Sequence, residues 1–229
     1  MRLTLSTLLL VVPFAATTPA AGTSFTYTTI NVPGIAGPQV TGIDNAGQLS
    51  GYGVVGKVFK GFVANGSAVT TSFLPGSSGT EAFGLNDAGQ IVGTYFDNTG
   101  GNHAFVGTTA VLTALNVPGA TSTMAANGIN NAGQIVGDFL SSGVIHGFLD
   151  SSGTFTTISV PGSSGTQALG LNSAGQIVGT YFDSSGHHAF LATPAAAVSE
   201  PSSMLLISFG LIATALAGRQ CRRSPINVG

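Results

Sequence analysis

The feature that most constrains the fold is a ten-residue motif that the chain repeats four times. The motif reads Gly-Ile/Leu-Asp/Asn, a variable residue, Ala-Gly-Gln, two further residues and a closing Gly. Its copies begin at Gly42, Gly84, Gly128 and Gly170, at intervals of 42, 44 and 42 residues. A fixed period of roughly 40 to 45 residues is that of one four-stranded propeller blade. The sequence therefore predicts an all-β repeat protein with four blades.

Each copy of the motif predicts a strand, a tight turn and a second strand. The Asp or Asn side chain can hydrogen-bond the turn backbone, and the internal glycine can adopt the left-handed conformation that the turn needs. A third strand follows around a His-Ala-Phe type tripeptide, and a fourth is of the Thr-Ile-Asn-Val-Pro-Gly kind. The predicted turn residues are Asp44 with Gly47, Asn86 with Gly89, Asn130 with Gly133, and Asn172 with Gly175.

Counting the strands predicts how the blades close. The fourth repeat lacks its own fourth strand, whereas a spare copy of that strand lies at Phe25 to Val32. If this N-terminal strand completes the last blade, no sheet edge is left open. We therefore expect a four-bladed, propeller-like ring closed by the N-terminal strand.

Both ends of the chain differ from the repeats. Residues 1–21 have a charged start, a short apolar run and small residues at the exit, which predicts a secretory signal peptide ahead of the repeats at 22–197. Residues 198–229 form a tail with an apolar segment at 204–218, short beside the roughly 20 residues of a comfortable membrane span. We expect this segment to be a membrane helix, because no polar face is visible in it. The basic cluster after it, which would stay in the cytoplasm, is Arg219, Arg222 and Arg223.

The charge of the repeats limits the partners that they can bind. Between Gly22 and Ser199 there are two lysines against seven carboxylates, a net charge of −5. Nothing basic is available to neutralise phosphates, so no nucleic-acid partner is expected. The single cysteine, Cys221, lies in the tail, so the repeats must fold without disulfides.

The candidates for chemistry in the repeats are weak. His103, His146 and His188 are potential metal ligands, but they lie on third strands, where hydrogen bonds to a turn of the same blade explain them better. The Gly-rich turns at Asp97 and Asp183 lack the oxygen ligands of a calcium loop. A Ser-His-Asp triad built on Asp183 has no Gly-x-Ser-x-Gly nucleophile elbow. We therefore expect no catalytic residue, metal or cofactor.

Three tyrosines follow the second strands, namely Tyr52, Tyr95 and Tyr181. Packing within the repeats is the favoured interpretation, because aromatic residues in repeats usually belong to the core. Stacking of these rings on sugars is the alternative.

The tail resembles the PEP-CTERM sorting signal, in which a Pro-Glu-Pro motif, a membrane segment and a basic cluster direct an exported protein to an exosortase. Glu200 and Pro201 match that motif, and Ser199 stands where its first proline would be. The resemblance implies processing near Glu200-Pro201, transient anchoring in the inner membrane, and a bacterium that makes exopolysaccharide or biofilm matrix.

The repeats resemble the HAF family of extracellular repeats, named for a His-Ala-Phe tripeptide. His103-Ala104-Phe105 and His188-Ala189-Phe190 match it, His146-Gly147-Phe148 departs by one residue, and Lys60-Gly61-Phe62 keeps the Phe alone. This resemblance implies an extracellular repeat domain and brings no known catalytic activity.

Together these observations favour an exported, non-enzymatic matrix or adhesion module at the cell surface. Its expected partners are the exosortase, an exopolysaccharide or a surface protein. A glycan-active enzyme of the matrix is the leading alternative, but it would need paired carboxylates, and those present are mostly single and lie at turns. A scaffold for a protein partner is a third reading, which an apolar patch would favour.

Overall fold

The computed structural model describes Tyr27 and residues 29–195. The chain divides into two units, Met1–Asn31 and Val32–Gly229. The described residues of the first unit form no helix or strand. All regular structure described in the second unit is β-strand.

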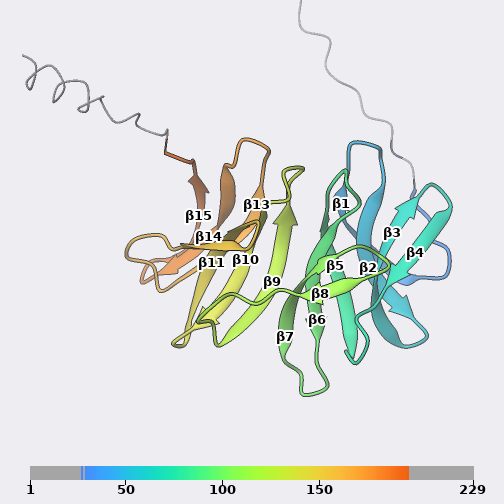
Figure 1. Cartoon of the computed structure of the whole chain (residues 1–229), viewed down its shortest axis with the longest axis horizontal. Coiled ribbons are helices and arrows are strands. Elements are labelled where there is room, and N and C mark those ends of the chain that lie inside the picture. The colour runs from blue at the N-terminus through green and yellow to red at the C-terminus, as the bar shows by residue number, and fades with distance from the viewer. Residues whose placement is uncertain (1–26, 28, 196–229) are drawn as a thin grey trace, which may run out of the picture. The chain divides into compact units, whose positions relative to one another are not determined.

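Four antiparallel sheets follow one another along the chain, and consecutive strands pair within each (Figure 1). We name them sheet 1 (β1–β4), sheet 2 (β5–β8), sheet 3 (β9–β12) and sheet 4 (β13–β15). The prediction of an all-β chain with four antiparallel sheets is confirmed. The strands are β1 (Ala36–Ile43), β2 (Leu49–Val55), β3 (Val58–Asn65), β4 (Ala68–Ser72), β5 (Gly79–Leu85), β6 (Ile91–Phe96), β7 (Asn102–Gly107), β8 (Leu112–Ala114), β9 (Ser122–Ile129), β10 (Ile135–Ser141), β11 (Val144–Ser151), β12 (Thr154–Ile158), β13 (Gly165–Leu171), β14 (Ile177–Asp183) and β15 (Gly186–Ala192).

The repeated motif forms the hairpin between the first and second strands of every sheet. In sheet 2, Leu85 pairs with Ile91 and Gly84 with Val92, and a bulge separates Gly84 from Ala82. The closing glycine of the motif lies beside this bulge, where Gly93 faces the backbone oxygen of Glu81 and the ring of Phe105. A side chain there would overlap both groups, so the hairpin requires glycine at this position.

The apolar core lies largely between successive sheets. Val92 and Ala104 of sheet 2 share one buried cluster with Ala126, Ile129 and other residues of sheet 3. Val136 of sheet 3 packs with Ala168 and Ile177 of sheet 4. Three phenylalanines of the third strands are fully buried, namely Phe62, Phe105 and Phe148. Burial between sheets is thus what makes each repeat depend on its neighbours.

The predicted closure into a ring is wrong for the described residues. Sheet 4 has three strands, ordered β13-β14-β15, and the sheets do not close on one another. Of the segment predicted to supply the missing strand, Tyr27 and residues 29–32 are described, and they are not in a strand. A count of strands predicts which strands could complete the last sheet. Closure of the ring depends instead on the angle between neighbouring sheets, and side-chain packing determines that angle.

The predicted signal peptide and the tail at 198–229 lie outside the described residues. Within Tyr27 and 29–195, no helix is long and apolar enough to cross a membrane.

Candidate functional site

The four predicted turns share one geometry. In each, the Asp or Asn side-chain oxygen accepts two backbone N–H groups. For Asn130 the donors are Ala132 N at 3.1 Å and Gln134 N at 3.0 Å. The glycine of each turn is left-handed, with φ between +74° and +79° at Gly47, Gly89, Gly133 and Gly175. The turn conformation is therefore fixed by contacts within five residues.

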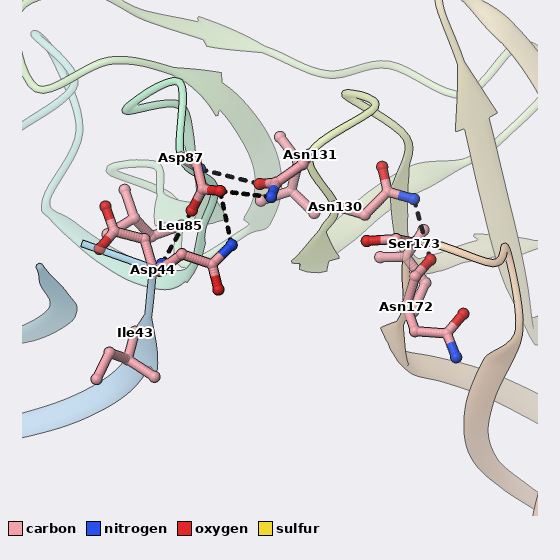
Figure 2. Close-up of a pocket in the computed structure, with 11 residues that line it drawn as sticks. Ile43, Asp44, Leu85, Asp87, Asn130, Asn131, Asn172 and Ser173 are labelled. Atoms are coloured by element: carbon pink, nitrogen blue, oxygen red, sulfur yellow. Dashed lines mark hydrogen bonds between the residues drawn. The ribbon is translucent and has the colours of Figure 1, made fainter. Parts of the chain in front are cut away.

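The ends of the four turns meet around one hollow of about 240 Å³ (Figure 2). Every repeat contributes the last residue of its first strand and polar residues of the turn that follows. We call this region the turn cluster. Its lining residues are Ile43, Asp44, Asn45, Leu85, Asp87, Ile129, Asn130, Asn131, Leu171, Asn172 and Ser173.

Asp87 ties three repeats together within the turn cluster. Its carboxylate accepts Asn45 N at 2.9 Å, Asn45 Nδ2 at 2.7 Å and Asn131 Nδ2 at 2.6 Å. In return, Asp87 N donates to Asn131 Oδ1 at 3.0 Å. These donors, the Asn45 backbone N–H first, lower the pKa of the Asp87 carboxyl. Asp87 is thus a charged structural acceptor and a poor general base at neutral pH.

A second chain of hydrogen bonds links the turns of sheets 2, 3 and 4 through the first Asn of each. Asn86 Nδ2 donates to the backbone oxygen of Asn130 at 3.2 Å, and Asn130 Nδ2 donates to that of Asn172 at 3.1 Å. Asn172 continues the pattern in sequence, but in the described residues its Nδ2 bonds only Gln176 Oε1, at 2.8 Å.

Two groups of functional residues were not found by sequence reasoning. One is the variable position of the motif, occupied by Asn45, Asp87, Asn131 and Ser173, which supplies part of the polar lining of the hollow. Its signal in the sequence is that it stays polar in all four copies. The motif glutamine is the other, because Gln134 Oε1 accepts from Asn130 Nδ2 at 2.8 Å and so orients the turn amide.

The histidines of two third strands bond the turn of their own sheet. His103 Nε2 lies 2.8 Å from Asp97 Oδ2, and His188 Nε2 lies 3.1 Å from Asp183 Oδ1. A hydrogen bond from the hydroxyl two residues further on, Thr99 or Ser185, is the main cause of a lowered pKa at both carboxyls, to about 2 for Asp183.

The same contacts do not form a catalytic triad. Ser185 Oγ and Asp183 Oδ1 both approach His188 Nε2, whereas a triad needs the carboxylate on the other ring nitrogen. In Tyr27 and residues 29–195, no group of three or more His, Cys, Asp or Glu side chains could hold a metal ion.

The three tyrosines neither line the hollow nor occupy equivalent positions. Tyr95 and Tyr181 stack on histidines of their own sheets, with ring centroids 5.0 Å and 4.9 Å apart. Tyr52 pairs with Gly61, so it occupies the position of Thr94 in sheet 2, one residue before that of Tyr95. Its ring meets that of Phe83 in sheet 2 edge-on, with the centroids 6.1 Å apart.

The sorting residues Ser199, Glu200 and Pro201, and the arginines 219, 222 and 223, lie outside the described residues. Residues 197–223 match the model of the PEP-CTERM protein-sorting motif. This match indicates a protein that is exported, sorted to the cell surface and processed by an exosortase. A search of curated proteins found no match to the sequence.

A comparison with solved structures found similarity to parts of other proteins. One is the β-propeller domain of the Trilobed protease from Pyrococcus furiosus, described as having an open velcro topology, with 11% identity and a TM-score of 0.42 over 58% of this chain and 40% of that chain. Another is the Aleuria aurantia lectin in complex with alpha-methyl-L-fucoside, with 18% identity and a TM-score of 0.37 over 72% of this chain and 62% of that chain. The present chain thus spans less than two thirds of either one.

Proposed function

We propose that this protein is a non-enzymatic surface module that binds neutral polysaccharide of the extracellular matrix through the turn cluster. The observation that carries the proposal is the hollow to which all four repeats contribute amide, carboxylate and hydroxyl groups. Such groups hydrogen-bond sugar hydroxyls in both directions. The apolar residues Ile43, Leu85, Ile129 and Leu171 beside them offer contact for the carbon faces of a sugar ring.

The sorting motif supports the address of this module. An exosortase substrate would be released at the cell surface, where its HAF-type repeats would be surrounded by biofilm matrix and exopolysaccharide. Sugar stacking on Tyr52, Tyr95 or Tyr181 is a weaker version of the proposal, because each ring already packs on another aromatic ring.

The test is co-sedimentation of the full chain with extracellular polysaccharide of the producing bacterium, followed by product analysis. Ser173 is exposed and lines the hollow, so Ser173→Trp should fill it and weaken binding about tenfold or more, a loss of about 1.4 kcal/mol. Ser67→Trp, at an exposed turn outside the hollow, is the matched control and should bind normally.

Each other outcome has a definite meaning. If both tryptophan variants still bind the polysaccharide, the turn cluster is not the binding site, and the tyrosines become the next candidates. Shortened polysaccharide chains would make the protein a glycan-active enzyme. Absence of binding would favour a scaffold for a protein partner.

A further inference from the structure

Within Tyr27 and residues 29–195, the two end sheets of the array expose apolar side chains whose counterparts inside the array are buried between sheets. In sheets 2 and 3, Val92 and Val136 are fully buried against the next sheet, whereas their counterpart in sheet 4, Val178, is 50% exposed. Leu169 and Leu191 on the same face of sheet 4 are also exposed. An apolar hollow of about 290 Å³, lined by Leu171, Val178 and Leu191 among others, lies on this face.

The backbone of sheet 4 is shaped for another first strand. A Cβ atom on Gly84 would meet Gly128 Cα of sheet 3 at 3.4 Å, and one on Gly128 would meet Gly170 Cα of sheet 4 at 3.3 Å. First strands of successive sheets thus approach one another at their glycines. The next glycine in this series, Gly170, meets within the described residues only its own sheet, at Val178 Cγ2.

Hydrogen bonding stops at the same face. The Asn86 and Asn130 side chains each donate to the turn of the next sheet, and Thr94 Oγ1 donates to Met124 O at 2.9 Å. Their counterparts Asn172 and Thr180 make no such bond to another sheet in the described part of the chain. Among the described residues, Asn172 Nδ2 bonds only within its own turn, and this face therefore has two donor groups that make no bond to another sheet.

The complementary face of sheet 1 is exposed along β1, whereas Phe62 and Ala64 of β3 on the same face are buried in a cluster with Val32. Leu85 and Ile129, which end the first strands of sheets 2 and 3, are 7% and 9% exposed against the preceding sheet, whereas Ile43 of sheet 1 is 67% exposed. Val40, in the position of the fully buried Ala82 and Ala126, is 43% exposed.

We propose that sheet 4 of one copy of this chain binds sheet 1 of a second copy. The new contact continues the three contacts that join sheets 1 to 4. Residues 165–183 match residues 79–97 at 16 of 19 positions, so sheet 4 offers nearly the surface with which sheet 2 holds sheet 3. Val178 would meet Ile43 of the second copy as Val92 meets Ile129, and Gly170 would admit the second copy's β1.

Cross-linking of the full chain tests the pairing directly. With Cys221→Ser as background, Ile43→Cys and Val178→Cys are made as separate proteins and treated with a short bifunctional maleimide. A mixture of the two should give a cross-linked dimer, and neither protein alone should, because the contact joins unlike faces. A mixture that yields no dimer at any concentration would overturn the proposal.

A double variant distinguishes a second copy from closure of the chain on itself. If one chain carrying both cysteines cross-links internally at every dilution, its own ends meet and the proposal is wrong. Cross-linking between chains that declines on dilution supports it.

The molar mass of the full chain in solution tests the pairing independently, with one valine variant at the proposed contact and one elsewhere as the control. Val178→Asp should return the assembly to single chains, because a carboxylate would be buried without a partner. Val111→Asp, at a valine that is 67% exposed outside both end faces, should leave the mass unchanged. An equal mass for Val178→Asp and the unaltered chain, with both folded, would contradict the proposal. Since neither Val178 nor Val111 lines the turn cluster, failure of this mass test would leave the proposed polysaccharide binding standing.

Discussion

At the scale of single residues, the turn glycines are required for their backbone conformation. Gly133 has φ +76°, and a Cβ there would meet nothing closer than Gln90 Oε1 at 3.9 Å. Gly133→Val should therefore cost about 1 to 3 kcal/mol through backbone strain alone. Asn tolerates this region, so Gly133→Asn should lose clearly less. Thermal unfolding of the full chain measures both, and an unchanged melting temperature for the valine variant would refute the turn assignment.

The glycine that closes the motif is required for a different reason, which is space. A Cβ on Gly93 would overlap Glu81 O and lie 2.8 Å from Phe105 Cε1, although its φ is not left-handed. Gly93→Ala should cost about 1 to 3 kcal/mol or more by overpacking. The control is Gly170→Ala, whose Cβ would meet, among the described residues, only Val178 Cγ2 at 3.5 Å. Equal melting of the two variants, measured at a dilution that keeps chains separate, would show that the close approach is not limiting.

At the scale of elements, the contact between sheets 3 and 4 contains a buried acid. Asp138 of β10 is 4% exposed and accepts Asn127 Nδ2 at 2.6 Å, while Asn127 also donates to Ala168 O of sheet 4 at 2.9 Å. Burial is the main influence on this carboxyl and raises its pKa above 3.8. The charged form is thus the costly one in the folded chain.

The sign of the pH dependence follows from this shift. Above the unfolded pKa, the folded chain binds more protons at Asp138 than the unfolded chain does, so stability falls as pH rises through the folded pKa. Asp138→Asn keeps an acceptor for Asn127 and should remove this fall. Melting temperatures of both proteins from about pH 4 to about pH 7 test it. Parallel curves would mean that Asp138 does not titrate in this range.

The sequence predicts the elements well where their causes are local. Turn residues such as Asn130 and Gly133 act on a backbone within five residues, and the order of strands in each sheet follows from them. The partners of Asp87 could not be predicted, because Asn45 and Asn131 lie 42 and 44 residues away in the chain. The prediction of ring closure was wrong for the same reason, because the angle between sheets depends on packing between residues of different repeats.

At the scale of the whole molecule, the repeats and the tail carry separate information. The repeats build a polar hollow at one end of the first strands and leave apolar faces on the first and last sheets. The sorting motif at 197–223 adds an address at the cell surface. The apolar side chains that sheets 1 and 4 expose among the described residues would therefore meet other copies at high local concentration, which favours weak contacts between chains.

Cleavage of the repeats from the tail determines whether contacts between chains form at the membrane or outside the cell. The motif of the sorting signal is Pro-Glu-Pro, and this chain has Ser199 before Glu200-Pro201. Proline restricts the free chain, so a proline-containing segment loses less conformational entropy when a processing enzyme binds it. Ser199→Pro should therefore raise the share of tail-free protein, and Glu200→Ala should lower it, with Ser203→Ala as the control. Immunoblots of membrane and released fractions, with intact masses, report the share. Equal release of Ser199→Pro and the unaltered chain would show that Glu200 and Pro201 suffice for recognition, whereas equal release of Glu200→Ala would show that this motif does not direct the cut.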